Sequence, residues 1–168
     1  FDKLGIEIHQ VYGLTETCGP ACVIGSEDAI SRAGSTGKAF FHTDVKIVRE
    51  DGSDADPDEA GEVVVRAKHI MLEYWNRPEA SAEAIQNGWF HTGDVATMDA
   101  DGFVYIQDRI KDMVISGGEN VYPAEVESAL IGHAKILEAG VIGQPSAKWG
   151  ESCAAIIVKS DDSLTEDE

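Results

Sequence analysis

Short runs of β-branched residues, each bounded by turn-forming residues, fill most of the chain up to about residue 109. Val45–Val48 and Val63–Arg66 are two such runs, and the polar segment REDGSDADPDEAG between them predicts a hairpin with a long loop. Trp89–Ile106 holds two more strand-like runs, joined by the turn signal DADG at Asp99–Gly102. The only helix predicted here is a short one within Arg77–Ile85. The first region is therefore predicted to be rich in β-structure.

The pattern changes after residue 110, where a compact α+β unit is predicted. Two strand-like runs, Met113–Ile115 and Asn120–Tyr122, flank the turn SGGE, and Pro123 then opens an amphipathic helix. Its apolar face is expected to include Val126, Ala129, Leu130 and His133, at helical spacing. Two further strands are predicted at Val141–Ile142 and Ala154–Val158.

Charge and hydropathy exclude several classes of function. The formal net charge is -18, which argues against non-specific binding of nucleic acid and against anionic membrane surfaces. An anionic ligand such as ATP would therefore need local donors and a metal ion. No run of apolar residues approaches the ~20 that a transmembrane helix needs, and the first ten residues, FDKLGIEIHQ, do not resemble a signal peptide. We predict a cytoplasmic protein.

The three cysteines, Cys18, Cys22 and Cys153, are odd in number. Their spacing fits neither a disulfide framework nor a zinc site. We interpret all three as reduced packing residues.

Two segments resemble ligand-binding loops without meeting the requirements. The acidic run at Asp51–Asp58 lacks the glycine and glutamate positions of a calcium loop, and Pro57 interrupts it. The GSTGK segment at Gly34–Lys38 has Arg32 where a phosphate loop needs its first glycine, and Ala39 where it needs Ser or Thr. We interpret both as ordinary loops.

Other motifs carry groups that suit a nucleotide. YGLTE at Tyr12–Glu16 offers an aromatic ring, a glycine, a hydroxyl and a carboxylate. WFHTGD at Trp89–Asp94 is expected to expose a carboxylate at a tight turn, and Ser116–Glu119 brings a pair of glycines. Each motif alone is also explained by a turn or a solvated loop.

In order along the chain, YGLTETCGP, GEVVVRA, GWFHTGD and DGFVYIQDRIKDMVISGGENVYPAEVES resemble the core motifs of the adenylate-forming superfamily. That superfamily contains acyl-CoA synthetases, adenylation domains of peptide synthetases and firefly luciferase. The resemblance extends from Val11 to Val158, and SGGENVYPAEVE is most similar to the fatty-acyl and aryl-acyl CoA ligase branch.

The resemblance implies a mixed α+β fold, in which a β-rich, barrel-like subdomain is followed by a hinge and a small α+β C-terminal domain. Residues 1–110 would be the C-terminal part of the large AMP-binding domain. Residues 111–168 would be the hinge and a truncated small domain. The implied reaction joins a carboxylic acid to AMP at the expense of MgATP, and then transfers the acyl group to coenzyme A.

The resemblance also implies a nucleotide-binding set. Tyr12 would stack on adenine, with Gly13 beside it, and Thr15 would hydrogen-bond the α-phosphate. Asp94 would accept both ribose hydroxyls, since a carboxylate has two acceptor oxygens for a vicinal diol. Arg109 would add a donor to the ribose.

The remaining implied roles concern the metal, the hinge and coenzyme A. Glu16 would engage Mg²⁺ and, with the phosphate-binding threonine, would be a catalytic residue. Lys111 would be the hinge residue, where many acyl-CoA ligases have Asp. Gly117 and Gly118 would line the tunnel for the pantetheine arm, where a side chain would take up the room. Trp149 would touch coenzyme A.

Several parts of such an enzyme are not found in this sequence. The family's phosphate loop and most of the acyl pocket lie upstream, and neither Lys148 nor Lys159 stands in the context of its catalytic lysine. We therefore expect a fragment that is inactive alone, and the sequence predicts neither the acid nor the oligomeric state. Two alternatives remain: an adenylation domain that feeds a carrier protein, and a non-catalytic nucleotide- or protein-binding module.

Overall fold

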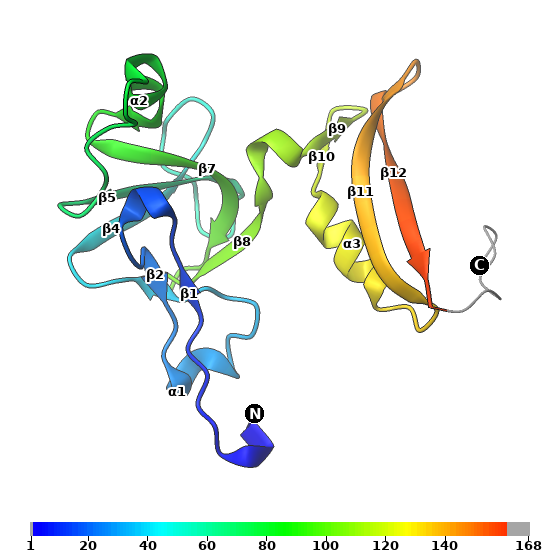
Figure 1. The fold of residues 1–168 in the computed structure, drawn as a ribbon, viewed down its shortest axis with the longest axis horizontal. Helices are drawn as coiled ribbons and strands as arrows, with labels where there is room; N and C mark the ends of the chain where they lie inside the picture. Colours follow the sequence, from blue (N-terminus) through cyan, green and yellow to red (C-terminus); the bar gives the residue numbers. More distant parts are fainter. Residues whose placement is uncertain (1, 161–168) are drawn as a thin grey trace. The chain divides into compact units, whose positions relative to one another are not determined.

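The structure is a computed structural model that describes residues 2–160. The chain divides into two compact units, with the boundary between Ile106 and Gln107. Figure 1 shows the elements of both units.

The first unit is built from short strands, as the sequence predicts. Its elements are η1 (Asp2–Leu4), β1 (Val11–Tyr12), η2 (Thr15–Thr17), β2 (Cys22–Val23), α1 (Ser26–Ala29), β3 (Lys38–Ala39), β4 (Thr43–Val48), β5 (Gly61–Ala67), α2 (Pro78–Ala84), β6 (Ile85–Gln86), β7 (Trp89–Met98) and β8 (Val104–Arg109), the last running across the boundary.

Two antiparallel sheets organise this unit. A small sheet has the order β1-β2-β3, and a larger one has the order β4-β5-β7-β6, with β8 paired to β7. The predicted hairpin is confirmed: β4 and β5 pair in continuous register from Thr43 opposite Ala67 to Val48 opposite Glu62. The predicted short helix is also confirmed as α2, which begins at Pro78.

The core of the first unit lies where the two sheets meet. Val63 and Val65 of β5, Cys22 of β2 and Val104 of β8 are fully buried in one cluster. β-Branched side chains pack well on a pleated surface, so the run of valines in β5 explains why this strand is central.

A register shift in the larger sheet matters for the site. Val95 pairs with Glu62, but His91 pairs with Val64, so three residues of β7 stand against one residue of β5. A bulge of this kind redirects side chains and is common beside active sites. Asp94 is one of the three residues in the bulge.

The second unit is a four-stranded antiparallel sheet with one helix. Its elements are η3 (Ile110–Asp112), β9 (Val114–Ser116), β10 (Glu119–Val121), α3 (Pro123–Ile131), β11 (Ile136–Ser146) and β12 (Gly150–Lys159), and the strand order is β10-β9-β12-β11. The predicted hairpin around SGGE is confirmed. The last two strands are much longer than predicted, and His133 lies beyond the helix whose face it was expected to join.

The helix α3 is fixed to its surroundings by two carboxylates. Asp108 accepts a hydrogen bond from the backbone N–H of Ala124, in the first turn, at 3.0 Å. Glu127 accepts one from the backbone N–H of Val141 in β11 at 2.8 Å. An acceptor at a helix N-terminus satisfies a donor that has no partner within the helix.

The predicted mixed α+β class is confirmed, and strands predominate. The interpretation of the cysteines needs correction: only Cys22 is a packing residue, because Cys18 and Cys153 are exposed. All three are free thiols, as predicted. Among the described residues, no helix combines the length and the apolar character required to cross a membrane.

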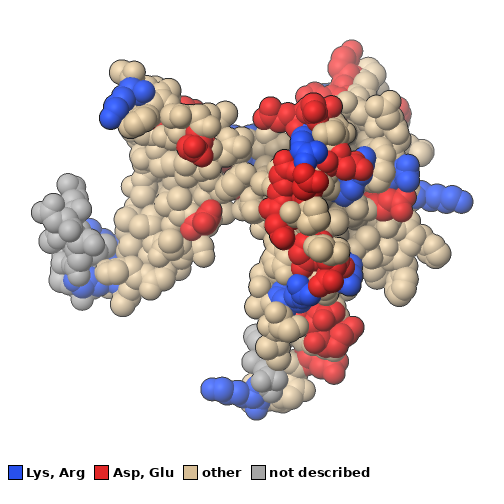
Figure 2. All heavy atoms as spheres, turned by 180° about the vertical axis from the view of Figure 1, so that it is seen from behind, with Lys and Arg blue, Asp and Glu red and all other residues tan. Residues whose placement is uncertain are grey.

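The acidic excess is unevenly distributed on the surface. On the face shown in Figure 2, acidic side chains gather on the first unit. Within the loop between β4 and β5, Arg49 forms ion pairs with Asp56 and Glu59, so part of this charge is neutralised locally. The hydrogen bond from Arg49 lowers the pKa of Glu59 below its usual value.

Candidate functional site

Two residues from different motifs meet in the first unit. The hydroxyl of Tyr12, at the end of β1, donates a hydrogen bond to Oδ2 of Asp94 in β7 at 2.6 Å. Burial, followed by this hydrogen bond, raises the pKa of Tyr12 well above its usual range. The phenol therefore keeps its proton and acts as the donor to the carboxylate.

Asp94 was expected at an exposed turn, and this expectation is wrong. The residue is only 7 % exposed because the bulge keeps it within the sheet. Gly93, with φ of 73°, forms the bend, and its N–H donates to Oε1 of Glu62 at 3.0 Å. The hydroxyl of Thr92 donates to the carbonyl of Val63 at 2.8 Å and accepts from the N–H of Asp94 at 3.1 Å.

A second contact of Glu62 adds to the support of this bend. Its Oε2 lies 2.7 Å from Nδ1 of His91, and both side chains are about three-quarters buried or more. Glu62 therefore contacts the bulged segment of β7 at two points. This carboxylate belongs to the GEVVVRA motif, for which the sequence alone suggested no role.

The YGLTE loop is closed by a buried threonine that sequence reasoning missed. The hydroxyl of Thr17 accepts from the N–H of Leu14 at 2.9 Å and lies 2.6 Å from the carbonyl oxygen of Gly19. Gly13 is required here, because a Cβ atom would lie 2.5 Å from that same carbonyl oxygen. Thr15 itself is exposed, so its hydroxyl is accessible to a ligand.

The segment after β5 holds this loop from the other side. Nδ1 of His69 lies 2.6 Å from the carbonyl oxygen of Thr17, so the ring donates to it. The N–H of Met71 donates to the carbonyl of Glu16 at 2.8 Å. The hydroxyl of Tyr74 donates to Oε1 of Glu16 at 2.9 Å. Burial, and then this bond, raise the pKa of Tyr74.

Arg109 ends β8 and belongs to the second unit. The predicted partnership of Asp94 and Arg109 at a ribose therefore stays a prediction. Lys111 lies in η3 and is exposed, at a hollow of about 350 Å³ that Asp108, Asp112 and Glu127 also line.

The predicted coenzyme A residues of the second unit do lie together. The N–H of Gly117 donates to the carbonyl of Trp149 at 2.8 Å. A Cβ atom on Gly117 would lie 2.8 Å from Cε3 of the indole, and Gly117 and Gly118 have φ of 62° and 89°. The indole is half exposed, and Nζ of Lys148 lies 4.2 Å from its ring centre.

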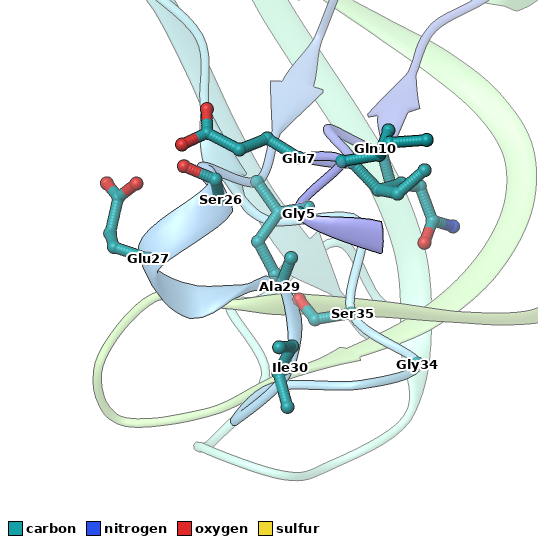
Figure 3. Close-up of a pocket in the computed structure, with 12 residues that line it drawn as sticks. Gly5, Glu7, Gln10, Ser26, Glu27, Ala29, Ile30, Gly34 and Ser35 are labelled. Carbon is teal, nitrogen blue, oxygen red and sulfur yellow. The ribbon is translucent and has the colours of Figure 1, made fainter. Parts of the chain in front are cut away.

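A larger groove in the first unit lies elsewhere. It has a volume of about 630 Å³ and runs between the N-terminal segment and α1, where Glu7, Glu27 and Ile30 line it (Figure 3). The lining residues do not include Tyr12 or Asp94. The groove is therefore not the predicted nucleotide site.

The metal prediction rests on Glu16 alone. Within the described part of the chain there is no group of three or more His, Cys, Asp or Glu side chains that could hold a metal ion by themselves. Mg²⁺ is usually bound by one or two carboxylates together with water and substrate phosphates. A single half-buried carboxylate beside an exposed hydroxyl fits such an ion only when a nucleotide supplies the other ligands.

Comparison with known proteins gives two family matches. The AMP-binding enzyme family matches residues 1–75, and the AMP-binding enzyme C-terminal domain matches residues 125–168. Long-chain-fatty-acid–CoA ligase FadD13 of Mycobacterium tuberculosis is 51% identical over 161 residues, which are 96% of this chain and 32% of that protein. The 2-succinylbenzoate–CoA ligase of Bacillus cereus is 43% identical over 164 residues, 98% of this chain and 34% of that protein.

Solved structures agree with these matches. O-succinylbenzoate coenzyme A synthetase (MenE) from Bacillus subtilis, in complex with ATP and magnesium ion, is 39% identical with a TM-score of 0.92, over 99% of this chain and 34% of that one. The chain thus spans about a third of the length of the relatives it matches. Because the relatives match nearly its whole length and both family matches, to residues 1–75 and 125–168, agree with them, the chain belongs to the AMP-binding, adenylate-forming enzyme family.

Proposed function

We propose that this chain is part of an ATP-dependent acid–thiol ligase, an acyl-CoA synthetase. The observation that carries the proposal is the pair of Tyr12 and Asp94, an aromatic ring bonded to a buried carboxylate at the position of two family motifs. Residues 1–110 would be the end of the large nucleotide-binding domain. Residues 111–168 would be the hinge and part of the small domain.

In the first half-reaction, an oxygen of the substrate carboxylate bonds to the α-phosphorus of ATP, and the bond to pyrophosphate breaks. In this chain, Tyr12 would stack on the adenine and Asp94 would accept the two ribose hydroxyls, with Gly13 leaving the backbone accessible. Thr15 would donate to the α-phosphate, and Glu16 would hold Mg²⁺. When bound, Mg²⁺ offsets the charge of the phosphates.

Asp94 changes partners in this scheme. Its carboxylate accepts a hydrogen bond from the Tyr12 hydroxyl at 2.6 Å. A ribose diol brings two donors to the same two oxygens. The tyrosine hydroxyl thus satisfies a buried charge until the nucleotide arrives, which limits the cost of leaving that charge unpaired.

In the second half-reaction, the sulfur of coenzyme A bonds to the acyl carbon, AMP leaves, and the thiol proton passes to solvent. Lys111 would be the hinge about which the small domain turns between the two steps. Gly117 and Gly118 would leave room for the pantetheine arm, with Trp149 beside it. The contact between Gly117 and the indole supports the grouping of these two residues, and Gly118 has open space beside it.

The substrate class follows only broadly from the relatives. One acts on long-chain fatty acids and another on 2-succinylbenzoate, as their names state. We propose a fatty or other organic acid, with ATP and coenzyme A as the other substrates. Cytoplasmic location and the lack of nucleic-acid partners stay predictions.

The test uses the whole ligase that carries this chain. Incubation with MgATP, coenzyme A and a panel of fatty and aromatic acids should give AMP, pyrophosphate and a thioester for at least one acid. Release of ADP and phosphate in place of AMP and pyrophosphate would refute the proposal. Transfer to a carrier protein, with free coenzyme A refused, would favour an adenylation domain.

The isolated chain provides a second test. The 168-residue chain should catalyse no ATP–pyrophosphate exchange, because it lacks the family's phosphate loop and catalytic lysine. Titration calorimetry with AMP would measure whether nucleotide affinity survives, and Asp94→Asn is the matched control. Robust exchange by the isolated chain would contradict the assignment of these missing parts.

A further inference from the structure

Glu16 is held by more than its own loop. Its backbone carbonyl accepts from the N–H of Met71 at 2.8 Å, and the next carbonyl, that of Thr17, accepts from the ring of His69 at 2.6 Å. These contacts fix the backbone of the loop. They do not reach the Glu16 side chain, whose carboxylate would otherwise turn about its own bonds.

One group of the same segment reaches that side chain. The hydroxyl of Tyr74 donates to Oε1 of Glu16 at 2.9 Å, across 58 residues of sequence. A carboxylate has two oxygens, so one can accept this proton while the other binds a cation. Groups that hydrogen-bond a metal-binding carboxylate set its orientation, and removing them typically weakens metal binding.

Tyr74 is in turn attached to α2. Its backbone N–H donates to the hydroxyl of Ser81 at 2.9 Å, and this hydroxyl donates to the carbonyl of Arg77 at 2.8 Å. Ser81 lies inside the helix, and Arg77 is the residue that precedes its first turn. A series of hydrogen bonds therefore connects α2, through Tyr74, to the Glu16 carboxylate.

We propose that Tyr74 is a positioning residue for the metal-binding carboxylate of Glu16, and that Ser81 holds Tyr74 in place. This inference rests on the proposed function, in which Glu16 binds Mg²⁺ together with ATP. Tyr74 touches neither the metal nor the nucleotide in this scheme. It restricts the orientations of the carboxylate, so that less freedom is lost when the ion binds.

The experiment measures metal binding directly in the whole ligase. Mn²⁺ replaces Mg²⁺, and electron paramagnetic resonance reports free Mn²⁺ in the presence of saturating ATP. Tyr74→Phe removes only the hydroxyl and should raise the dissociation constant of Mn²⁺ about tenfold. The affinity for metal-free ATP should stay unchanged, which a general loss of structure would not allow.

A matched control is available in the same unit. Tyr105 of β8 is a partly buried tyrosine outside the YGLTE loop and outside the segment after β5, so Tyr105→Phe removes the same atom elsewhere in the unit. Its Mn²⁺ binding should equal that of the wild type. Equal Mn²⁺ affinity in the Tyr74→Phe and Tyr105→Phe variants would overturn the inference.

Two further variants keep the result unambiguous. In a Glu16→Gln background, Tyr74→Phe should change Mn²⁺ affinity by less than about twofold, because the two residues act as one unit. If Tyr74→Phe does not fold, Ser81→Ala decides the question. Ser81→Ala leaves the phenol in place and should weaken Mn²⁺ binding about threefold. Wild-type Mn²⁺ binding in this variant would refute the proposed series of hydrogen bonds from α2 through Tyr74 to Glu16.

Failure of this inference is distinguishable from failure of the proposed function. A wild-type protein that binds Mn²⁺ and ATP but forms no thioester with any acid would contradict the ligase assignment alone. A wild-type protein that forms thioester, with Mn²⁺ binding unaffected by Tyr74→Phe, would contradict the role of Tyr74 alone.

Discussion

Replacing Tyr12 with Phe should destabilise the first unit by about 2 kcal/mol. The substitution keeps the ring and removes only the hydroxyl that donates to Asp94. The O···O distance of 2.6 Å is typical of a charge-assisted bond to an ionised carboxylate. Hydrogen bonds to charged groups contribute about 1.5–3 kcal/mol, and the 7 % exposure of Asp94 leaves water little access to replace the lost donor.

The assay is urea unfolding of the 168-residue chain near neutral pH, followed by circular dichroism. Tyr105→Phe serves as the reference, because it removes the same atom from a tyrosine that is only partly buried, where water can hydrate the site. Its loss should stay below about 1 kcal/mol. Asp94→Asn and the double variant complete a cycle that isolates the coupling between Tyr12 and Asp94.

The reasoning would be refuted by either of two results. A loss in Tyr12→Phe that equals the loss in Tyr105→Phe would mean that the buried pair contributes no more than a partly hydrated hydroxyl. A coupling energy near zero would mean that Tyr12 acts through packing alone. In the same variant, AMP binding should be at least as strong as in the wild type, because the ribose no longer competes with the phenol for Asp94.

The remaining predictions concern backbone, pH and capping. Gly37→Ala should destabilise the chain by about 2 kcal/mol more than Gly34→Ala, measured by urea unfolding. Both glycines have φ above 90°, but only at Gly37 would a Cβ atom clash with neighbouring backbone. Equal losses of stability in the two variants would contradict this reasoning. Burial raises the pKa of the Cys22 thiol to about 12. The unfolded chain, whose thiol has a pKa of about 8.5, therefore loses this proton at lower pH than the folded chain. The stability that depends on the protonated thiol is complete below about pH 8.5 and is lost as the pH rises toward 12. Cys22→Val should therefore flatten the fall of stability over this range, and an unchanged slope would argue against it. Asp108→Ala should remove about 1 kcal/mol of protection from hydrogen exchange in the first turn of α3, whereas Asp108→Asn should retain most of it; identical exchange in both variants would exclude the cap.

Local patterns predicted the elements whose partners lie close in sequence. The hairpin of β4 and β5 follows from two β-branched runs and a polar connection, and α2 follows from Pro78. The strands β11 and β12 were predicted at only part of their length. Gly143, Pro145 and Gly150 interrupt the local β signal, but continuous pairing between the two strands extends through these residues.

The sequence predicted which residues form the candidate site better than it predicted their burial and their hydrogen-bond partners. The motifs identified Tyr12 and Asp94, but TGD has the appearance of an exposed turn, and its burial depends on Glu62, about thirty residues earlier. Tyr74 belongs to no recognised pattern, and its contact with Glu16 depends on a chain path that no local signal encodes. Long-range contacts of this kind are fixed by tertiary structure alone.

The bulge in β7 also constrains how this protein can vary in length. Side chains alternate between the two faces of a strand, so losing or gaining one residue there would move everything that follows to the opposite face. Val95 and Ala96 are both buried and lie on opposite faces, so the shift would exchange a larger and a smaller side chain between two packed faces. Losing two residues would restore the alternation and give an uninterrupted ladder, but it would leave the segment without the bend that places Asp94 beside Tyr12. Insertions and deletions in this strand should therefore be far less tolerated than substitutions on its surface.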